Sequence, residues 1–266
     1  MMEVKFDIAR KSDVPALKKM WQEIFKDTKE YTELYFSYKF KEGNAFVIRI
    51  EDEIISTLYV EYTDLFIEGK ILKGAYFCGI ATKKEHRGKG FAGRLIEYAK
   101  KNIQKTDIIY LIPANNSLFN FYKSFGFREF TCIDRLKIKR EEGVKLPPYT
   151  NEFNYELINS FYEKSGNSLY VKRDEAFFKA IYDCYKNISV FKDGYVIWYI
   201  EENIPHLIEY SFSYERAVEI LKGLLNERNE EEGIIYKKWG NEPFTVCITD
   251  LEIREINNKY INLMLN

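Results

Sequence analysis

The strongest constraint on the fold is a pattern that occurs twice along the chain. Residues 47–63, VIRIEDEIISTLYVEYT, and residues 188–203, ISVFKDGYVIWYIEEN, each place a short acidic turn between two apolar runs. Such a pattern predicts two strands joined by a hairpin, and Asp193–Gly194 is a strong turn signal for one. Helical segments precede the hairpin in both halves. The repeat therefore predicts a duplicated fold with low sequence identity between the halves.

A linker is expected between these halves. Residues 141–150, EEGVKLPPYT, combine charge with Gly143, Pro147 and Pro148, which is typical of a connecting segment. A chain of 266 residues is long enough for two ordinary domains. We therefore predict two domains, residues 1–142 and residues 143–266.

Composition narrows the classes of function. A formal net charge of −1 argues against a dedicated nucleic-acid or membrane-surface protein. The four cysteines, Cys78, Cys132, Cys184 and Cys247, form no close pair, and the chain has only two histidines, so no metal site is expected. The N-terminus lacks an apolar segment typical of a signal peptide, and no run approaches the roughly 18 apolar residues of a membrane span. We expect a cytoplasmic protein with reduced thiols.

The stretch EHRGKGFAGRLIEYAK, residues 85–100, contains two overlapping glycine patterns. The first is GxGxxG at Gly88, Gly90 and Gly93, the fingerprint of dinucleotide-binding proteins. Its context argues against that function, because residues 82–87 separate it from the preceding strand. The next predicted strand, 107–113, also ends without the acidic residue that would bind the ribose.

The second pattern is Arg87-x-x-Gly90-x-Ala92, at the start of a predicted helix. Backbone N–H groups at the start of a helix lack internal partners, and small residues let an anion such as a pyrophosphate approach them. Lys89 and Arg94 would add positive charge. The alternative is an ordinary glycine-rich turn between a strand and a helix, with solvated basic residues.

The surroundings of the loop favour the anion site. Residues 76–99 resemble motif A of the GCN5-related N-acetyltransferase (GNAT) superfamily, and residues 111–127 resemble the motif that follows it. The resemblance covers about half of the chain, in the right order and spacing. It implies an α+β (α/β) GNAT fold, a mixed and mostly antiparallel twisted sheet flanked by helices. It also implies an enzyme that transfers acetyl from acetyl-CoA directly to a primary amine in a ternary complex.

The resemblance also implies where acetyl-CoA would bind. Strand 76–82 would diverge from strand 107–113, and pantetheine would lie in the gap against main-chain groups of the first strand. The pyrophosphate would rest on N–H groups of residues 87–94. The cofactor-binding residues implied in this way are Cys78, Gly79, Ile80, Thr82, Arg87, Gly88, Lys89, Gly90, Phe91, Ala92, Gly93, Arg94 and Asn115. The Cys78 thiol itself, inside an apolar strand, is expected to be a packing group rather than a nucleophile.

The catalytic residue implied by the resemblance is Tyr122, the acid that would protonate the leaving thiolate. Its spacing with neighbouring apolar residues also fits a core position. Asn115 would lie near pantetheine, or else cap a turn. The general base stays open, because strand 71–78 carries no carboxylate. Glu61 or Glu33 acting through water, or an amine that arrives neutral, are the alternatives. We expect His86 to be solvated.

The second half is expected to repeat the fold without its chemistry. After its strand 207–212 comes SYERAVEI, with no glycine, so we predict that this domain binds no acetyl-CoA and walls the acceptor pocket. An active first domain and a degenerate second one resemble the first two domains of Eis-type acetyltransferases. Those usually carry a third domain whose C-terminal carboxylate reaches the active site. At 266 residues this chain is too short to include it, so no catalytic role is expected for Asn266.

The predicted function is acetyl transfer to a small-molecule amine. Two alternatives remain: a non-catalytic protein that senses acetyl-CoA or bridges partners, and an acetyltransferase acting on protein lysines or N-termini. No nucleic-acid or membrane partner is expected. The sequence predicts neither the acceptor nor the oligomeric state.

Overall fold

The computed structural model describes residues 3–253 and 259–261 of the chain, so the expectation about Asn266 lies outside the described residues. Contacts divide these residues into two compact units. The first unit holds residues 3–130 and 244–253, and the second holds residues 131–243 and 259–261. Each unit is a sheet with helices packed on it, and each is described here by itself.

The sheet of the first unit is mixed and mostly antiparallel, as predicted. Its strands, in spatial order, are β1 (Val4–Ile8), β2 (Ala45–Ile50), β3 (Glu53–Ile67), β4 (Lys70–Thr82), β5 (Ile108–Leu111) and β12 (Glu242–Ile248). β4 and β5 run parallel, and the other neighbours are antiparallel. A helix connects β4 to β5, as a parallel pair requires.

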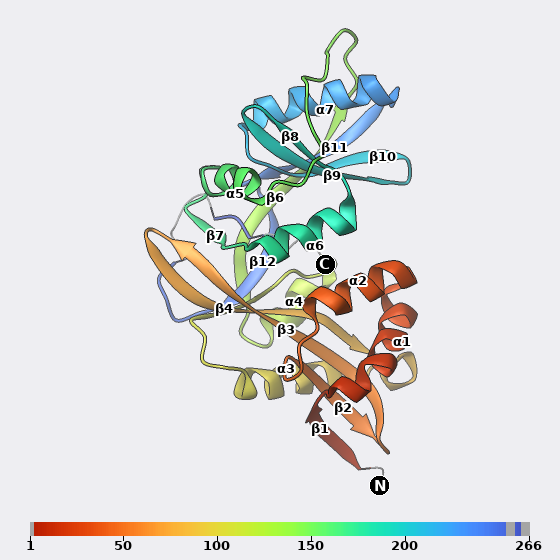
Figure 1. Ribbon diagram of the computed structural model, residues 1–266. Helices are drawn as coiled ribbons and strands as arrows, with labels where there is room; N and C mark the ends of the chain where they lie inside the picture. The colour runs from red at the N-terminus through yellow and green to blue at the C-terminus, as the bar shows by residue number, and fades with distance from the viewer. Residues whose placement is uncertain (1–2, 254–258, 262–266) are drawn as a thin grey trace. The chain divides into compact units, whose positions relative to one another are not determined.

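Helices α1 (Val14–Phe25) and α2 (Lys29–Lys39) cover one face of this sheet (Figure 1). α1 buries Leu17, Met20 and Trp21 on its inner side, and the Trp21 ring stacks on Tyr35 of α2 with 4.3 Å between centroids. α3 (Phe91–Asn102), α4 (Ser117–Lys123) and the short 3-10 helices η1 (Lys11–Asp13) and η2 (Lys84–His86) complete the unit.

The second unit repeats the same plan. Its sheet has the order β6 (Arg128–Lys139), β11 (Glu232–Lys238), β10 (Ile204–Tyr210), β9 (Gly194–Glu201) and β8 (Ile188–Phe191). β10 and β11 are parallel and are joined through α7 (Tyr214–Arg228). The remaining elements are α5 (Tyr155–Glu163), β7 (Leu169–Val171) and α6 (Glu175–Tyr185).

The last strand of each half lies in the sheet formed by the other half. β6 follows β5 in the chain but pairs with β11, whereas β12 follows β11 and pairs with β5. Each sheet is therefore completed by a strand from the other half. The division at residue 142 remains a prediction about how the sequence is organised, because the compact units group the chain by contact and assign residues 244–253 to the first unit.

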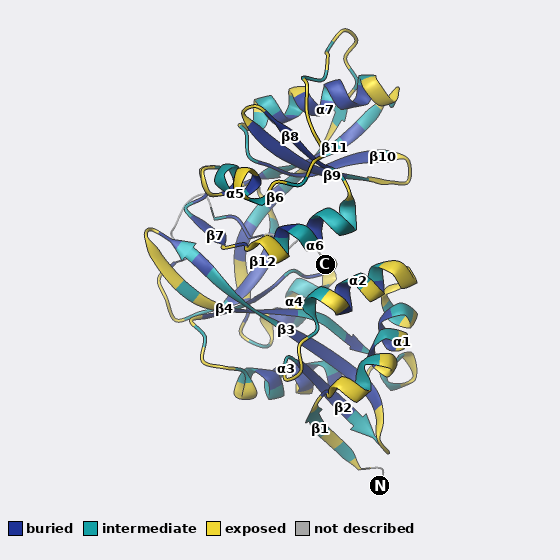
Figure 2. Ribbon diagram, in the orientation of Figure 1, coloured by how far each residue is buried: buried dark blue, intermediate teal, exposed yellow. Residues whose placement is uncertain are grey.

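A buried ionic cluster lies in the core of the second unit. Both Glu209 carboxylate oxygens accept hydrogen bonds from Arg173, at 2.6 and 2.8 Å, and Tyr195 and Tyr260 donate their hydroxyls to the same carboxylate. A buried charge needs such partners to offset the loss of water. Figure 2 shows the strands around this cluster as mostly buried and the outer helix faces as exposed. Among the described helices, none is long and apolar enough to cross a membrane.

Candidate active site

A bulge interrupts β4 at the predicted cofactor strand. Tyr59 of β3 lies opposite Cys78, and Thr57 lies opposite Ala81, so Gly79 and Ile80 together face one residue of β3. Gly79 has φ +54°, and a Cβ there would lie 2.5 Å from the Tyr59 ring. Only glycine fits this conformation and this space. Bulges of this kind re-aim the main chain beside active sites.

The parallel ladder between β4 and β5 ends just before the bulge. Their parallel pairing runs from Gly74–Ile108 to Tyr76–Tyr110, but β4 continues to Thr82. The last part of β4, which holds Cys78, Gly79, Ile80 and Thr82, therefore extends past its partner, as the resemblance implies. Its outward main-chain groups can pair with an extended ligand in the manner of an added strand. Thr57 already donates its hydroxyl to the Gly79 carbonyl at 3.1 Å.

α3 begins without a side-chain cap. Its N-cap residue is Gly90, at φ +74°, and no side chain among the described residues caps this end. In contrast, Thr28, Asn154, Asp174 and Ser213 accept a backbone N–H at the starts of α2, α5, α6 and α7. The first-turn N–H groups of α3 thus keep their capacity to bind an anion, aided by the helix dipole.

The loop before α3 is held by its own basic residues. The Arg87 Nε donates to the Thr82 carbonyl at 3.0 Å, which ties the loop to the end of β4. The Lys89 Nζ donates to the Glu85 carbonyl at 3.1 Å. Both residues are exposed, so their charge remains available to an anion beside Gly88 and Gly90. His86 is half-buried, with its ring centroid 6.3 Å from that of Phe91, rather than solvated as expected.

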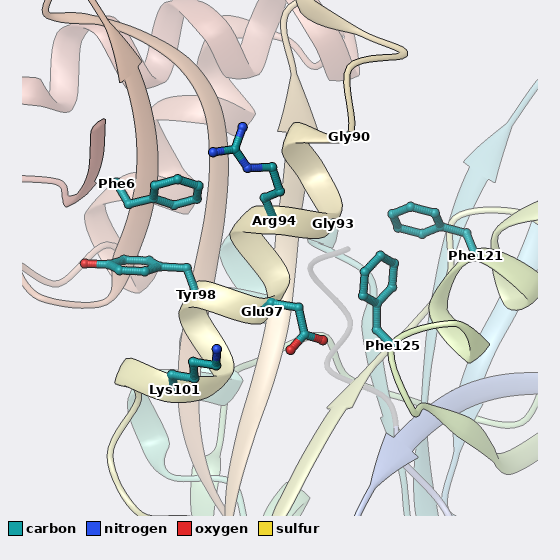
Figure 3. A pocket seen from close by; sticks show the side chains of 9 residues that line it. All are labelled: Phe6, Gly90, Gly93, Arg94, Glu97, Tyr98, Lys101, Phe121 and Phe125. Carbon is teal, nitrogen blue, oxygen red and sulfur yellow. The ribbon is translucent and has the colours of Figure 1, made fainter. Parts of the chain in front are cut away.

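A groove of about 550 Å³ runs along α3 from Gly90 to Lys101. Figure 3 shows Phe6 and Tyr98 on one side of the helix and Phe121 and Phe125 on the other. The Arg94 guanidinium lies over the Phe6 ring at 5.1 Å and over the Phe91 ring at 5.6 Å. The groove thus combines aromatic surface with cations, beside the open end of α3.

Tyr122 of α4 is buried, and burial raises the pKa of its phenol to about 12. Its ring packs edge-on against Phe127 at 5.9 Å. Tyr76 is the last β4 residue paired with β5, and its pKa is raised by burial, by Cys78, Glu61 and Tyr110, and to a smaller extent by Tyr122. Phe127, against which Tyr122 packs, lies 6.4 Å from the ring of Phe77, the β4 residue next to Tyr76. Tyr122 thus has both the packing of a core residue and a place near the divergence of the strands.

Asn115 has the local role that the sequence left open. Its side-chain oxygen accepts from the Ser117 N–H at 3.1 Å and from the Ser117 hydroxyl at 2.6 Å. It is exposed at the turn before α4. Its side chain therefore serves the turn, and any contact with pantetheine stays a prediction.

A polar group of side chains lies on the α2 side of the sheet. The Glu61 carboxylate accepts from the Lys39 Nζ at 2.6 Å and faces the Cys78 Sγ at 3.8 Å, and Tyr35 OH lies 3.2 Å from the same sulfur. Burial, and next the Glu61 charge, raise the pKa of the Cys78 thiol well above its usual range. This supports a packing role for Cys78 over a nucleophilic one.

Of the two carboxylates considered as bases, Glu61 is the less exposed, with 11% of its side chain accessible. Glu33 is exposed and pairs with Lys18. Sequence reasoning did not find the Lys39–Glu61 pair, and its one signal was that Glu61 shares the face of Tyr59 on an alternating strand. Within the part of the chain that the structure describes, no group of three or more His, Cys, Asp or Glu residues could hold a metal ion.

A family model identifies the domain that contains this site. Residues 5–130 match the model described as an acetyltransferase (GNAT) domain. This part of the chain is a GNAT domain. The GNAT domain contains the bulge, the end of the β4–β5 ladder and the uncapped helix, and the matching family is one of acetyltransferases.

Solved structures match the GNAT domain together with the rest of the chain. A conserved protein from Enterococcus faecalis V583 matches at 16% identity and a TM-score of 0.69, over 92% of this chain and 72% of its own. A GCN5-related N-acetyltransferase from Anabaena variabilis ATCC 29413 matches at 16% and 0.69, over 97% and 75%. Eis1 from Mycobacterium abscessus matches at 12% and 0.62, over 93% and 73%. At these identities the matches show the fold, which confirms the predicted GNAT fold class. No curated protein sequence matches the chain.

Proposed function

We propose that this chain is an N-acetyltransferase that moves acetyl from acetyl-CoA directly to a primary amine of a small molecule. The observation that carries the proposal is the continuity of three features along the chain. β4 leaves β5 after Tyr76, bulges at Gly79, and leads through a short loop to the uncapped start of α3 at Gly90. Together these features offer main-chain groups to an extended arm and N–H groups to a pyrophosphate.

The proposed acetyl-CoA site consists of the residues predicted from the sequence. The main chain of Cys78, Gly79, Ile80 and Thr82 would hold pantetheine. N–H groups of residues 87–94 would hold the pyrophosphate. The aromatic and cationic groove along α3 is suited to the adenosine end, because rings stack on a base and cations attract phosphate.

The proposed reaction needs one acid near the sulfur. The neutral amine attacks the thioester carbon, a C–N bond forms and the C–S bond breaks. Tyr122 would donate its proton to the thiolate, and the proton that the amine nitrogen loses would replace it. With its pKa at about 12, Tyr122 keeps this proton at neutral pH. The thiol of Cys78 takes no part.

We propose that the second unit binds no acetyl-CoA. Only residues 211–213 separate β10 from α7, and the Ser213 hydroxyl accepts the Arg216 N–H at the start of that helix. Side chains therefore stand where the first unit presents glycines. This supports one acetyl-CoA per chain.

The test is calorimetric titration of acetyl-CoA, with NADH as a parallel ligand, into the wild type and two glycine variants. Gly90→Glu places bulk and negative charge at the start of α3, and should weaken acetyl-CoA binding at least 100-fold. The new carboxylate would repel the pyrophosphate and would itself occupy the positive end of the helix dipole. Gly69→Glu is the matched control. Gly69 lies in the β3–β4 turn at φ +81°, and both glycines have no atom within 4 Å of an added Cβ.

We expect one acetyl-CoA per wild-type chain, no NADH, and unchanged binding for Gly69→Glu. Two acetyl-CoA per chain would overturn the proposal for the second unit. Equal losses in both variants would show that backbone strain, not the ligand site, weakens binding. Binding without acetyl transfer to any amine would favour the sensor alternative.

A further inference from the structure

Lys39 and Glu61 form a salt bridge that is largely withdrawn from water. Their side chains are 10% and 11% exposed, and 2.6 Å separates the Lys39 Nζ from the Glu61 Oε2. The pair joins the last residue of α2 to the middle of β3, inside the first unit. The pair between Lys18 and Glu33, which joins α1 to α2, is instead at the surface.

Stability alone gives little reason for a buried pair at this place. Removing two charges from water is costly, and apolar residues of similar size often stabilise a fold as well or better. Glu209 of the second unit meets that cost with four hydrogen bonds to its carboxylate. Glu61 accepts at Oε2 from Lys39, while its Oε1 faces the Cys78 thiol at 3.8 Å, a long and weak contact. The Glu61 carboxylate thus has capacity for a further donor.

The position of Glu61 links it to the proposed acetyl site. Glu61 lies opposite Tyr76, the residue at which β4 and β5 separate, and its carboxylate faces Cys78, which lies just beyond that point. Because of the bulge, the stretch from Cys78 to Thr82 lies opposite only three residue steps of β3, from Tyr59 to Ser56. At about 3.3 Å per residue, Cys78 therefore lies roughly 10 Å back along the strand from Thr82. An arm that starts at the loop after Thr82 and follows β4 would bring its far end, which carries the acetyl group, near Cys78.

We propose that Glu61 is the binding carboxylate for the ammonium group of the acceptor, and that Lys39 occupies its place in the free protein. The inference rests on the proposed function and names the acceptor class: a primary alkylamine, charged at neutral pH and carried on a flexible aliphatic stem. Lys39 is itself such an amine, and its contact with Glu61 shows that the site accommodates one.

Two consequences follow from competition for one carboxylate. An acceptor must displace Lys39, so its apparent affinity is lowered by the fraction of molecules in which Lys39 holds the site. Removing the Lys39 ammonium should therefore strengthen acceptor binding. Removing the Glu61 charge should weaken it, because a charge-assisted hydrogen bond is lost.

The test is calorimetric titration of 1,4-diaminobutane into the full chain, with acetyl-CoA titrated separately. We expect Glu61→Gln to weaken diamine binding at least tenfold and Lys39→Met to strengthen it about tenfold. Lys39→Met/Glu61→Gln should bind as weakly as Glu61→Gln, and this double variant leaves no unpaired buried charge that could unfold the protein. Lys18→Met/Glu33→Gln is the matched control, with an exposed pair removed, and should bind as the wild type does. Acetyl-CoA binding should stay within twofold throughout.

The two titrations separate the two proposals. If the wild type does not bind acetyl-CoA, the proposed function is contradicted. Diamine binding that depends on Glu61 would still support the subsite in that case. Diamine affinities within twofold across the wild type, Glu61→Gln and Lys39→Met would overturn the subsite, as would no diamine binding by any of them. With transfer measured, aniline, which is neutral at pH 7, should show a KM that Glu61→Gln leaves unchanged. An equal rise in the KM for 1,4-diaminobutane and in the KM for aniline would also overturn the proposed subsite.

Discussion

Tyr122 is a buried core residue and the proposed general acid, and a single substitution can separate these two roles. Replacing it with Phe keeps the ring that packs on Phe127 and removes only the hydroxyl. We expect acetyl-CoA binding to stay within about twofold and kcat to fall by about 100-fold, the low end for loss of a general acid. Tyr62→Phe is the control, because it removes a hydroxyl that accepts the Gln104 N–H, on the same unit. Steady-state kinetics with a saturating amine would measure both.

The pH profile of the wild type gives the same hypothesis a second test. A tyrosine is charged when it loses its proton, and burial disfavours that charge, so the pKa of Tyr122 rises to about 12. The phenol therefore stays protonated as pH rises from 7 to 10, and kcat should not fall over that range. A fall with a midpoint below pH 10 that Tyr122→Phe abolishes would contradict the raised pKa. Full activity of Tyr122→Phe would leave Tyr122 as a core residue.

At the scale of single residues, the sequence indicated the loop glycines but not the Lys39–Glu61 pair. Gly90 lies in a local pattern, and its positive φ and its place at the start of α3 follow from neighbours along the chain. Lys39 and Glu61 come from a helix end and a strand middle, and only the packing of α2 on the sheet brings them together. Local periodicity carries no information about such a contact.

At the scale of elements, the starts of α3 and α7 differ in a way that the sequence already indicated. Ser213 caps α7 with its hydroxyl, whereas Gly90 leaves α3 open. Ser213→Ala should lower the free energy of unfolding by about 1 kcal/mol, because an N-cap hydrogen bond is lost. Urea unfolding followed by circular dichroism would measure it, and acetyl-CoA binding should not change.

Ser160→Ala is the control for this cap. The Ser160 hydroxyl donates to the Leu157 carbonyl within α5, so its loss should cost little in a helix that alanine favours. Equal destabilisation by both variants would show that Ser213 does not act as a cap. Weakened acetyl-CoA binding in Ser213→Ala would indicate that the start of α7 contributes to the ligand site.

Strand β6 is longer than its local sequence pattern indicates. Residues 127–132, FREFTC, and residues 135–140, RLKIKR, each have the pattern of a separate short strand, but β6 is continuous from Arg128 to Lys139. Asp134 breaks the alternation in its middle, yet its carboxylate accepts the Asn241 N–H at 2.7 Å and lies in register with Lys237. A distant partner therefore stabilises a residue that would locally interrupt a strand, and the local pattern could not show it.

At the scale of the whole molecule, the exchange of β6 and β12 was the feature furthest from prediction. Alternation identifies a strand but does not name its neighbour. β6 and β12 have equivalent places in the two halves, so either pairing satisfies the same apolar pattern. The sequence indicated the duplicated plan. The exchange of the last strands became clear only from the structure, in which β12 pairs with β5.

This exchange predicts that residues 1–142 do not form a stable domain alone. Such a fragment lacks β12, whose Val246 and Cys247 are buried in the first unit, and it exposes the edge of β5. An unpaired edge and lost apolar burial both favour aggregation or unfolding. We expect the fragment to unfold at a lower urea concentration than the full chain, and a synthetic peptide of residues 240–252 to raise its midpoint. A scrambled peptide of the same composition is the control. A fragment that unfolds at the midpoint of the full chain would show instead that the two predicted domains are independent along the sequence, with β12 dispensable to the first.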